Sequence, residues 1–234
     1  NWLGNKVTMD QNRMITTLAI KHGLGESTKV SKTPMPPGIV LTPKEDSEDF
    51  PEGCPYPELV CAMLFIARYT RPDVLFHITY LCRFLTKYNR THWKQAMNVL
   101  RYLKHTMEDI KLTYVLQPDA PTLSIYMDAD WAGDPEDRKS TTGAIVFYHG
   151  NPVSWISQKQ KTVSTSTSEA EYKTMTYAFK EGMYYYNLIE KELKQNITPI
   201  PTRMNSLNPV ESYGDNKGAI FMVNQRVSNN RSKH

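Results

Sequence analysis

The sequence predicts an α/β protein in which a mainly helical region precedes a mixed sheet with flanking helices. Apolar residues follow a helical period up to about residue 106 and an alternating, strand-like period from residue 123. The later elements follow the order β-β-β-α-β-α, which is typical of a mixed α/β domain. The proline-rich stretch 117–121 marks the change of period. We therefore divide the chain into 1–57, 58–118 and 119–234.

Composition narrows the class of protein. Of the 234 residues, 40% are hydrophobic and 22% are charged, which indicates a folded chain. No apolar run approaches about 18 residues, so no membrane span is expected. The three cysteines, Cys54, Cys61 and Cys82, lack the C-x-x-C spacing of a zinc site, and we expect free thiols.

The net charge of +4 is not spread evenly along the chain. Residues 1–118 hold 15 Lys and Arg against 11 Asp and Glu, whereas residues 119–234 hold 13 of each kind. The first half is therefore the basic one.

Residues 1–57 predict a helix over about 10–22, ended by Gly23 and Gly25, and then an extended connector over 31–57. The connector contains seven prolines, which is too many for a helix or a central strand. They are Pro34, Pro36, Pro37, Pro43, Pro51, Pro55 and Pro57.

Residues 58–106 predict three helices, with a break at Arg71-Pro72-Asp73 and Thr91 as the N-cap of the third. Aromatic residues are interleaved with eight basic ones, which are Arg68, Arg71, Arg83, Lys87, Arg90, Lys94, Arg101 and Lys104. We take Arg83, Lys87 and Lys94 as candidate contacts to nucleic-acid phosphates. The alternative is a solvated helix face over an aromatic core.

After the boundary, strands are predicted near 123–127, 144–148 and 153–156, with a turn at 149–152. A long helix over about 168–194, a short strand near 211–214 and a helix from about Asn216 follow.

Glu171 heads the apolar stripe of the long helix. Met175, Ala178 and Gly182 follow it at helical spacing, so the period turns Glu171 toward the sheet and Glu169 away from it. A capping box with Ser168 is the alternative for Glu171, although Ser166 and Glu169 make the same S-x-x-E match.

Two further acids lie at element ends. Asp128 ends the first strand pattern and Asp215 joins the last strand to its helix. Each alone is most often a cap or a solvated strand end. Together with Glu171 they supply the carboxylate oxygens that hard divalent cations prefer, so a metal site is one hypothesis for this end of the domain.

Several motifs run in order along the chain. In the second half they are 126–134 (YMDADWAGD), 137–143 (DRKSTTG), Ser154-Trp155, 168–172 (SEAEY), Asp215-Asn216 and 231–234 (RSKH). In the first half they are Leu3-Gly4, 33–35 (TPM), 70–73 (TRPD), His92-Trp93 and 99–104 (VLRYLK). Together they resemble the C-terminal part of copia-type LTR-retrotransposon Pol polyproteins: a reverse transcriptase tail with its thumb and connection region, followed by a ribonuclease H domain.

The resemblance implies a ribonuclease H-like fold for 119–234 and a function as a metal-dependent endonuclease. Asp128, Glu171 and Asp215 match metal-binding catalytic acids, which would hold two Mg²⁺ ions, or Mn²⁺ as a substitute, and cleave the RNA strand of an RNA–DNA hybrid. Lys159 and Lys161 are candidate phosphate contacts, with a solvated loop as the alternative. The rest of the Pol polyprotein is an expected partner, and a cytoplasmic virus-like particle or the nucleus is the expected location.

The sequence also departs from the family pattern. The Tyr-x-Asp-Asp motif of a polymerase site is missing, so no DNA polymerisation is expected. The family continues past its Lys-His pair to a fourth acid, whereas this sequence ends at His234, so we expect impaired cleavage. A catalytically impaired or domesticated module that binds nucleic acid or protein is the alternative function. A transposase or integrase fits the motifs poorly.

Overall fold

The computed structural model describes residues 2–3, 5–25, 30–43, 53–134, 136–189 and 211–215. The chain divides into two compact units, residues 1–113 and 114–234. Within the described part, no helix is long and apolar enough to cross a membrane.

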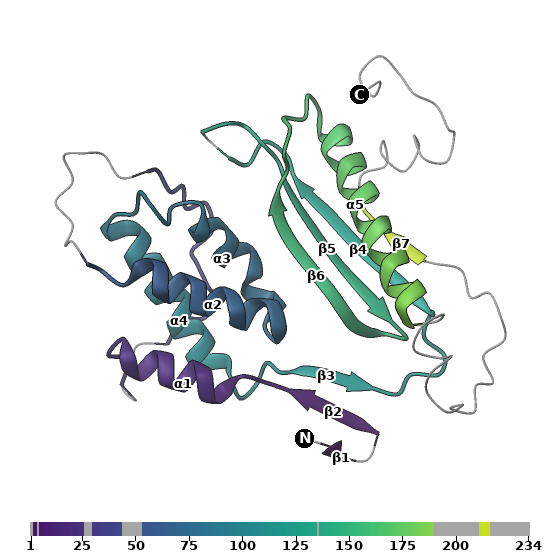
Figure 1. Ribbon diagram of the computed structural model, residues 1–234, viewed down its shortest axis with the longest axis horizontal. Helices are drawn as coiled ribbons and strands as arrows, with labels where there is room; N and C mark the ends of the chain where they lie inside the picture. Colours follow the sequence, from purple (N-terminus) through teal and green to yellow (C-terminus); the bar gives the residue numbers. More distant parts are fainter. Residues whose placement is uncertain are drawn as a thin grey trace. The chain divides into compact units, whose positions relative to one another are not determined.

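The first unit is mainly helical (Figure 1). Its elements are β1 (Trp2–Leu3), β2 (Lys6–Met9), α1 (Asn12–Lys21), α2 (Tyr56–Tyr69), the short 3-10 helix η1 (Pro72–Val74), α3 (Leu75–Cys82) and α4 (Arg90–Thr106), and β3 (Leu112–Val115) spans the boundary to the second unit. The predicted helices are present. The small sheet β1-β2-β3 was not predicted, because its strands are too short to show an alternating period.

The core of the first unit lies between its helices. Apolar side chains that recur every three or four residues of α2, among them Leu59, Met63 and Ile66, are fully buried, as are Ile78 of α3 and Leu100 of α4. The amphipathic pattern of the sequence therefore corresponds to the buried faces of these helices.

The start of α4 differs from the prediction. Asn89, not Thr91, is its N-cap, and the Asn89 side chain accepts hydrogen bonds from the backbone N–H groups of Thr91 and His92. The His92 ring in turn accepts from the N–H of Asn89, which completes a capping box. Asn89 and His92, for which the sequence predicted no capping role, thus satisfy N–H groups at this helix end.

The second unit contains β4 (Leu123–Asp130), β5 (Thr141–Tyr148), β6 (Asn151–Lys159), α5 (Thr167–Asn187) and β7 (Glu211–Tyr213). The strand order is β6-β5-β4-β7, with antiparallel pairs except for the parallel pair β4–β7. This confirms the predicted mixed sheet with a flanking helix, consistent with a ribonuclease H-like fold. The predicted helix from Asn216 and the predicted extension of α5 over 190–194 lie outside the described residues.

The turn between β5 and β6 is tight. It consists of His149 and Gly150, both with positive φ, at 46° and 70°. Two such residues make the mirror-image turn that matches the twist of an antiparallel hairpin. This turn is shorter than the predicted 149–152, because β6 already begins at Asn151.

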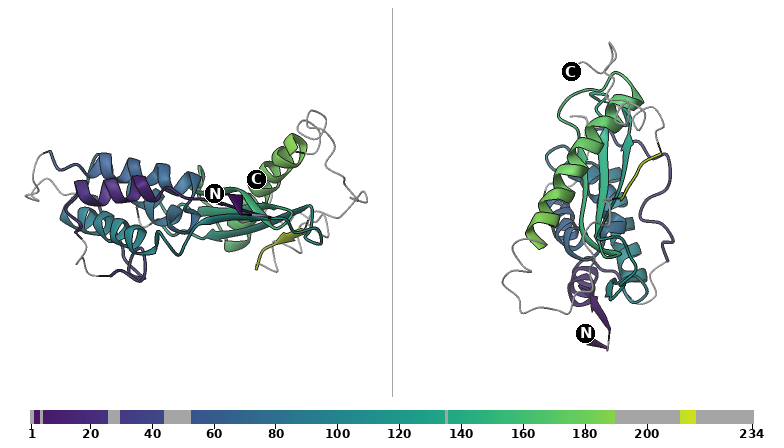
Figure 2. Two further views of the ribbon diagram at one scale, coloured as in Figure 1. Left: turned by 90° about the horizontal axis from the view of Figure 1, so that it is seen from below. Right: turned by 90° about the vertical axis from the view of Figure 1, so that its right-hand side faces the viewer.

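Helix α5 packs along one face of the sheet, as Figure 2 shows. Its Met175 and Ala178 contact Leu123, Ile125 and other buried residues of β4 and β5. At Gly182 the approach is so close that a Cβ would lie 2.5 Å from Cδ1 of Ile125. Glycine at this position therefore allows the helix to lie close against β4, and this packing fixes the helix turn that carries Glu171.

Candidate functional site

Helix α5 begins beside the sheet and brings Glu171 to it. Ser166 is the N-cap, because its hydroxyl accepts a hydrogen bond from the N–H of Glu169. Glu171 lies within the first helical turns and is only 4% exposed. Its Oε1 accepts a hydrogen bond of 3.2 Å from the N–H of Ala129 in β4. The period of the helix therefore predicted the direction of Glu171, and the capping role belongs to Ser166.

The parallel pairing of β4 with β7 aligns the two aspartates. Ser124 pairs with Glu211 and Tyr126 with Tyr213, whose rings stack with their centroids 4.6 Å apart. Continuing this register by two residues places Asp128 opposite Asp215, on the same face as the stacked rings. A strand of only three residues thus sets the position of the third acid.

The three carboxylates form one cluster. One oxygen of each of Asp128, Glu171 and Asp215 lies within 4.8 Å of the others. Burial raises the pKa of Glu171 from 4.5 to about 7; the N–H of Ala129 opposes this rise, and the negative charges of Asp128 and Asp215 add to it. Three oxygen donors whose charges repel one another, with one of them buried, are a donor set that suits a hard divalent cation.

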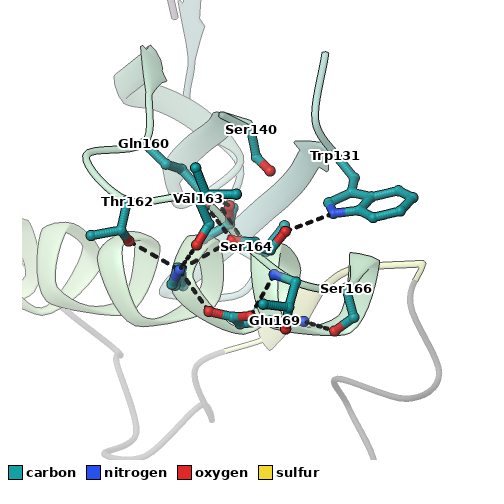
Figure 3. A network of polar contacts seen from close by, with 12 residues as sticks. Trp131, Ser140, Gln160, Thr162, Val163, Ser164, Ser166 and Glu169 are labelled. Carbon is teal, nitrogen blue, oxygen red and sulfur yellow. Dashed lines mark hydrogen bonds and ion pairs between the residues drawn. The ribbon is translucent and has the colours of Figure 1, made fainter. Parts of the chain in front are cut away.

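A polar network ties the loop before α5 to the helix (Figure 3). Lys173 pairs with Glu169 at 2.7 Å and donates to Thr162, to the carbonyl of Val163 and to the hydroxyl of Ser164. The other oxygen of Glu169 accepts from the N–H and hydroxyl of Thr165. The loop is therefore held in one conformation next to the helix end that carries Glu171.

The loop after β4, like the loop before α5, is held in place by hydrogen bonds. The indole N–H of Trp131 donates to the carbonyl of Ser164, and the N–H of Ala132 donates to the buried hydroxyl of Ser140. A Cβ at Gly133 would lie 1.9 Å from Oδ2 of Asp130, so the turn closes over that carboxylate. Sequence reasoning gave Trp131 no role, since its partner lies 33 residues away and leaves no local pattern.

Lys159 and Lys161 lie in different surroundings. Lys159 at the end of β6 makes ion pairs with Asp134 at 2.7 Å and Asp137 at 2.9 Å. These contacts lower the pKa of Asp134 against the effect of its burial and raise the pKa of Lys159. Lys161 is exposed. Lys159 therefore has a structural role in joining Asp134 and Asp137 to the end of β6, and of the two lysines only Lys161 has an exposed side chain.

Three of the eight basic residues between 68 and 104 are held by contacts within the first unit. Arg71 is 2% exposed and donates two hydrogen bonds to Asp73 and one to Thr106. Lys104 binds the carbonyl of Leu24 at the end of the segment after α1, and Arg101 binds Asn98. These three side chains stabilise the fold of this unit.

The three candidate phosphate contacts of the first unit differ in the exposure of their side chains. Lys87 and Lys94 are exposed, whereas Arg83 is half-buried with its guanidinium 5.1 Å from the centre of the Tyr80 ring. Lys87 and Lys94 are therefore the better placed of the three to reach a bound strand.

The mixed sheet, the helix across it and the carboxylate cluster at their junction define a ribonuclease H-like α/β domain. No family model and no solved structure matches the chain. Curated proteins do match it. The retrovirus-related Pol polyprotein from transposon RE2 of Arabidopsis thaliana is 31% identical over 208 residues, which are 89% of this chain and 13% of that protein.

Two further relatives extend the comparison. The Pol polyprotein from transposon TNT 1-94 of Nicotiana tabacum is 32% identical over 181 residues, 77% of this chain and 12% of that protein. Secreted RxLR effector protein 161 of Plasmopara viticola is 39% identical over 136 residues, 57% of this chain and 92% of that protein. The chain belongs to the family of retrovirus-related Pol polyproteins of copia-type transposons. It spans about one eighth of the Pol polyproteins it matches.

Proposed function

We propose that residues 114–234 form a metal-dependent ribonuclease H that hydrolyses the RNA strand of an RNA–DNA hybrid. The observation that carries the proposal is the convergence of Asp128, Glu171 and Asp215 within 4.8 Å, from β4, α5 and the segment after β7. Membership of a retrotransposon Pol family supports the choice of a hybrid as substrate, because such elements copy RNA into DNA.

The three carboxylates would hold Mg²⁺ or Mn²⁺. Bound there, the cations would supply an activated water and neutralise charge on the leaving oxygen. Asp128 and Asp215 lie side by side and exposed, so they can reach ions at the surface that the hybrid covers. Glu171 closes the site from helix α5, and the N–H of Ala129 in β4 holds its Oε1 in place.

The raised pKa of Glu171 fits a site that takes up cations. Without a cation this carboxylate retains a proton up to about pH 7, because its burial and the two aspartates disfavour its charge. A bound cation would offset that repulsion and release the proton. Metal binding by the chain should therefore strengthen as the pH rises through this range.

A cleavage assay tests the proposal. The 234-residue chain is incubated with a hybrid whose RNA strand is labelled, with Mg²⁺, with Mn²⁺ or with a chelator. We expect metal-dependent cleavage of the RNA strand, and none of duplex DNA. Asp128→Asn should lower the rate at least about a hundredfold, because the amide keeps the shape but loses the charge that holds the cation.

Asp130→Asn is the matched control. Asp130 lies two residues further along the same strand and on the same face, yet outside the cluster, so its substitution should change the rate only a few-fold. Cleavage that survives Asp128→Asn would refute the metal mechanism. Hybrid binding without cleavage in either metal would instead support a binding module.

For the first unit we propose an auxiliary role in holding the hybrid. Lys87 and Lys94 are exposed, and cations of this kind bind phosphates without reading sequence. Other parts of a Pol polyprotein are a proposed partner.

A further inference from the structure

Trp131 combines an exposed ring with a fixed position. Its side chain is 44% exposed, and a single exposed aromatic residue is common on any protein surface. What sets Trp131 apart is the hydrogen bond of 3.1 Å from its indole nitrogen to the carbonyl of Ser164. The ring therefore cannot turn freely, although much of it faces solvent.

The backbone next to Trp131 is strained. Ala132 has φ of +49°, in the left-handed region that costs a residue with a Cβ about 1 kcal/mol. The N–H of Ala132 donates to the hydroxyl of Ser140, which is 0% exposed, so the surrounding structure maintains this conformation. Strain maintained in this way favours a functional reason for the position of the neighbouring side chain.

Ser164, which accepts the hydrogen bond from Trp131, is also held in place by its neighbours. Ser164 is 3% exposed, its hydroxyl donates to Gln160, and Lys173 donates to that same hydroxyl. Gln160 is bonded in turn to the carbonyl of Ala170, one residue before Glu171. Figure 3 shows the Trp131 ring beyond this network, with only its nitrogen turned toward Ser164.

Trp131 thus connects the two segments that carry acids of the cluster. It lies three residues after Asp128, and its hydrogen bond reaches the loop that leads into the helix of Glu171. The exposed ring therefore lies on the segment directly after the strand that carries Asp128. A flat apolar ring makes no favourable contact with a phosphate, but it can pack against the sugar and base rings that lie between phosphates.

We propose that Trp131 is a substrate-contact residue whose exposed ring packs against a sugar–base unit of the bound RNA–DNA hybrid. The proposal rests on the proposed function of the acid cluster and adds a residue that positions the strand. Because the ring is fixed before the hybrid arrives, little side-chain freedom is lost on binding.

The alternative is that Trp131 only joins two loops. A purely structural role would need only the indole N–H and the buried part of the ring. In that case a variant without the ring would be less stable, but while folded it would bind the hybrid as tightly as the wild type. The two roles therefore differ in what removal of the whole ring does, compared with removal of the N–H alone.

Three variants separate these roles: Trp131→Ala, Trp131→Phe and, as a matched exposed aromatic residue on the same unit, Tyr184→Ala, where the side chain is 60% exposed. Affinity for the hybrid is measured in the presence of a chelator, so that no cleavage occurs, and thermal unfolding is followed for each variant. We expect Trp131→Ala to weaken binding about tenfold, since stacking of one ring on nucleic acid is worth that much.

Trp131→Phe should keep most of the affinity, and Tyr184→Ala should keep all of it. The change in tryptophan fluorescence on hybrid binding should be largest in the wild type and reduced in Trp131→Phe. Equal affinity of the wild type and folded Trp131→Ala would overturn the Trp131 proposal and leave the nuclease intact. A wild-type chain that neither binds nor cleaves the hybrid would overturn both.

Discussion

Replacing Glu171 by Gln should stabilise the metal-free protein at alkaline pH. Burial disfavours the ionised form of this carboxylate in the folded protein, and the charges of Asp128 and Asp215 add to the effect. Gln has nearly the same shape, and its carbonyl oxygen can still accept the hydrogen bond from the N–H of Ala129. The substitution thus removes the charge and keeps the packing.

The size of the effect follows from the pKa of Glu171, which is raised from 4.5 to about 7. A tenfold change in proton affinity is worth about 1.4 kcal/mol, so the full difference corresponds to about 3 kcal/mol. Water around the exposed Asp128 and Asp215 screens part of this, and we expect about 1–2 kcal/mol.

The difference in stability between Glu171→Gln and the wild type depends on pH, and it develops between pH 4.5 and about pH 7. Because the folded protein holds this proton more tightly than the unfolded chain does, the cost of Glu171 is absent below pH 4.5 and fully present above about pH 7. The stability of Glu171→Gln should therefore match the wild type in acid and exceed it at about pH 8 in a chelator.

Denaturant unfolding at several pH values provides the assay, with Glu169→Gln as the control on the same helix. Contacts with Lys173 and Thr165 lower the pKa of Glu169 to about 2 against the effect of burial, so its charge stabilises the fold above pH 4.5. Glu169→Gln should therefore lose stability at about pH 8, the opposite sign. A metal-free Glu171→Gln protein that is less stable than the wild type there would refute the reasoning.

Two further predictions concern the basic residues. Replacing Lys87 and Lys94 together by Ala should weaken hybrid binding and reduce the slope of log affinity against log salt by about two, and an unchanged slope would mean that neither side chain contacts a phosphate. Lys159→Met should lower the free energy of unfolding by about 1–2 kcal/mol, because it removes the ion pair that Lys159 makes with the buried Asp134. Lys161→Met, measured beside it in the same denaturation experiment, should cost nothing; equal effects would contradict the structural role of Lys159.

Local periodicity predicted much of the fold and part of the candidate site. The alternation of β4 and the helical stripe of α5 are properties of neighbouring residues, so the directions of Met127 and Glu171 follow from spacing alone. The cap of α4 was misplaced by two residues, because Asn89 and Thr91 are both good cap residues and only the path of the chain decides between them.

Contacts between residues that are far apart in the sequence could not be predicted from local periodicity. For Lys159 the sequence offers a phosphate contact or a solvated loop. It does not predict the ion pairs with Asp134 and Asp137, because these residues come near Lys159 only when β6 pairs with β5. Arg71 was counted among surface charges, although its side chain turns inward to Asp73. A count of charges along the sequence does not distinguish a solvated cation from one that is already paired.

The three-residue length of β7 has a consequence for how the site assembles. Two of the acids lie on β4 and α5, which share the core of the domain, whereas Asp215 depends on a short outer strand held to the described sheet by one neighbour. Among the described residues, the geometry of the cluster therefore depends on one three-residue strand pairing as well as on the core.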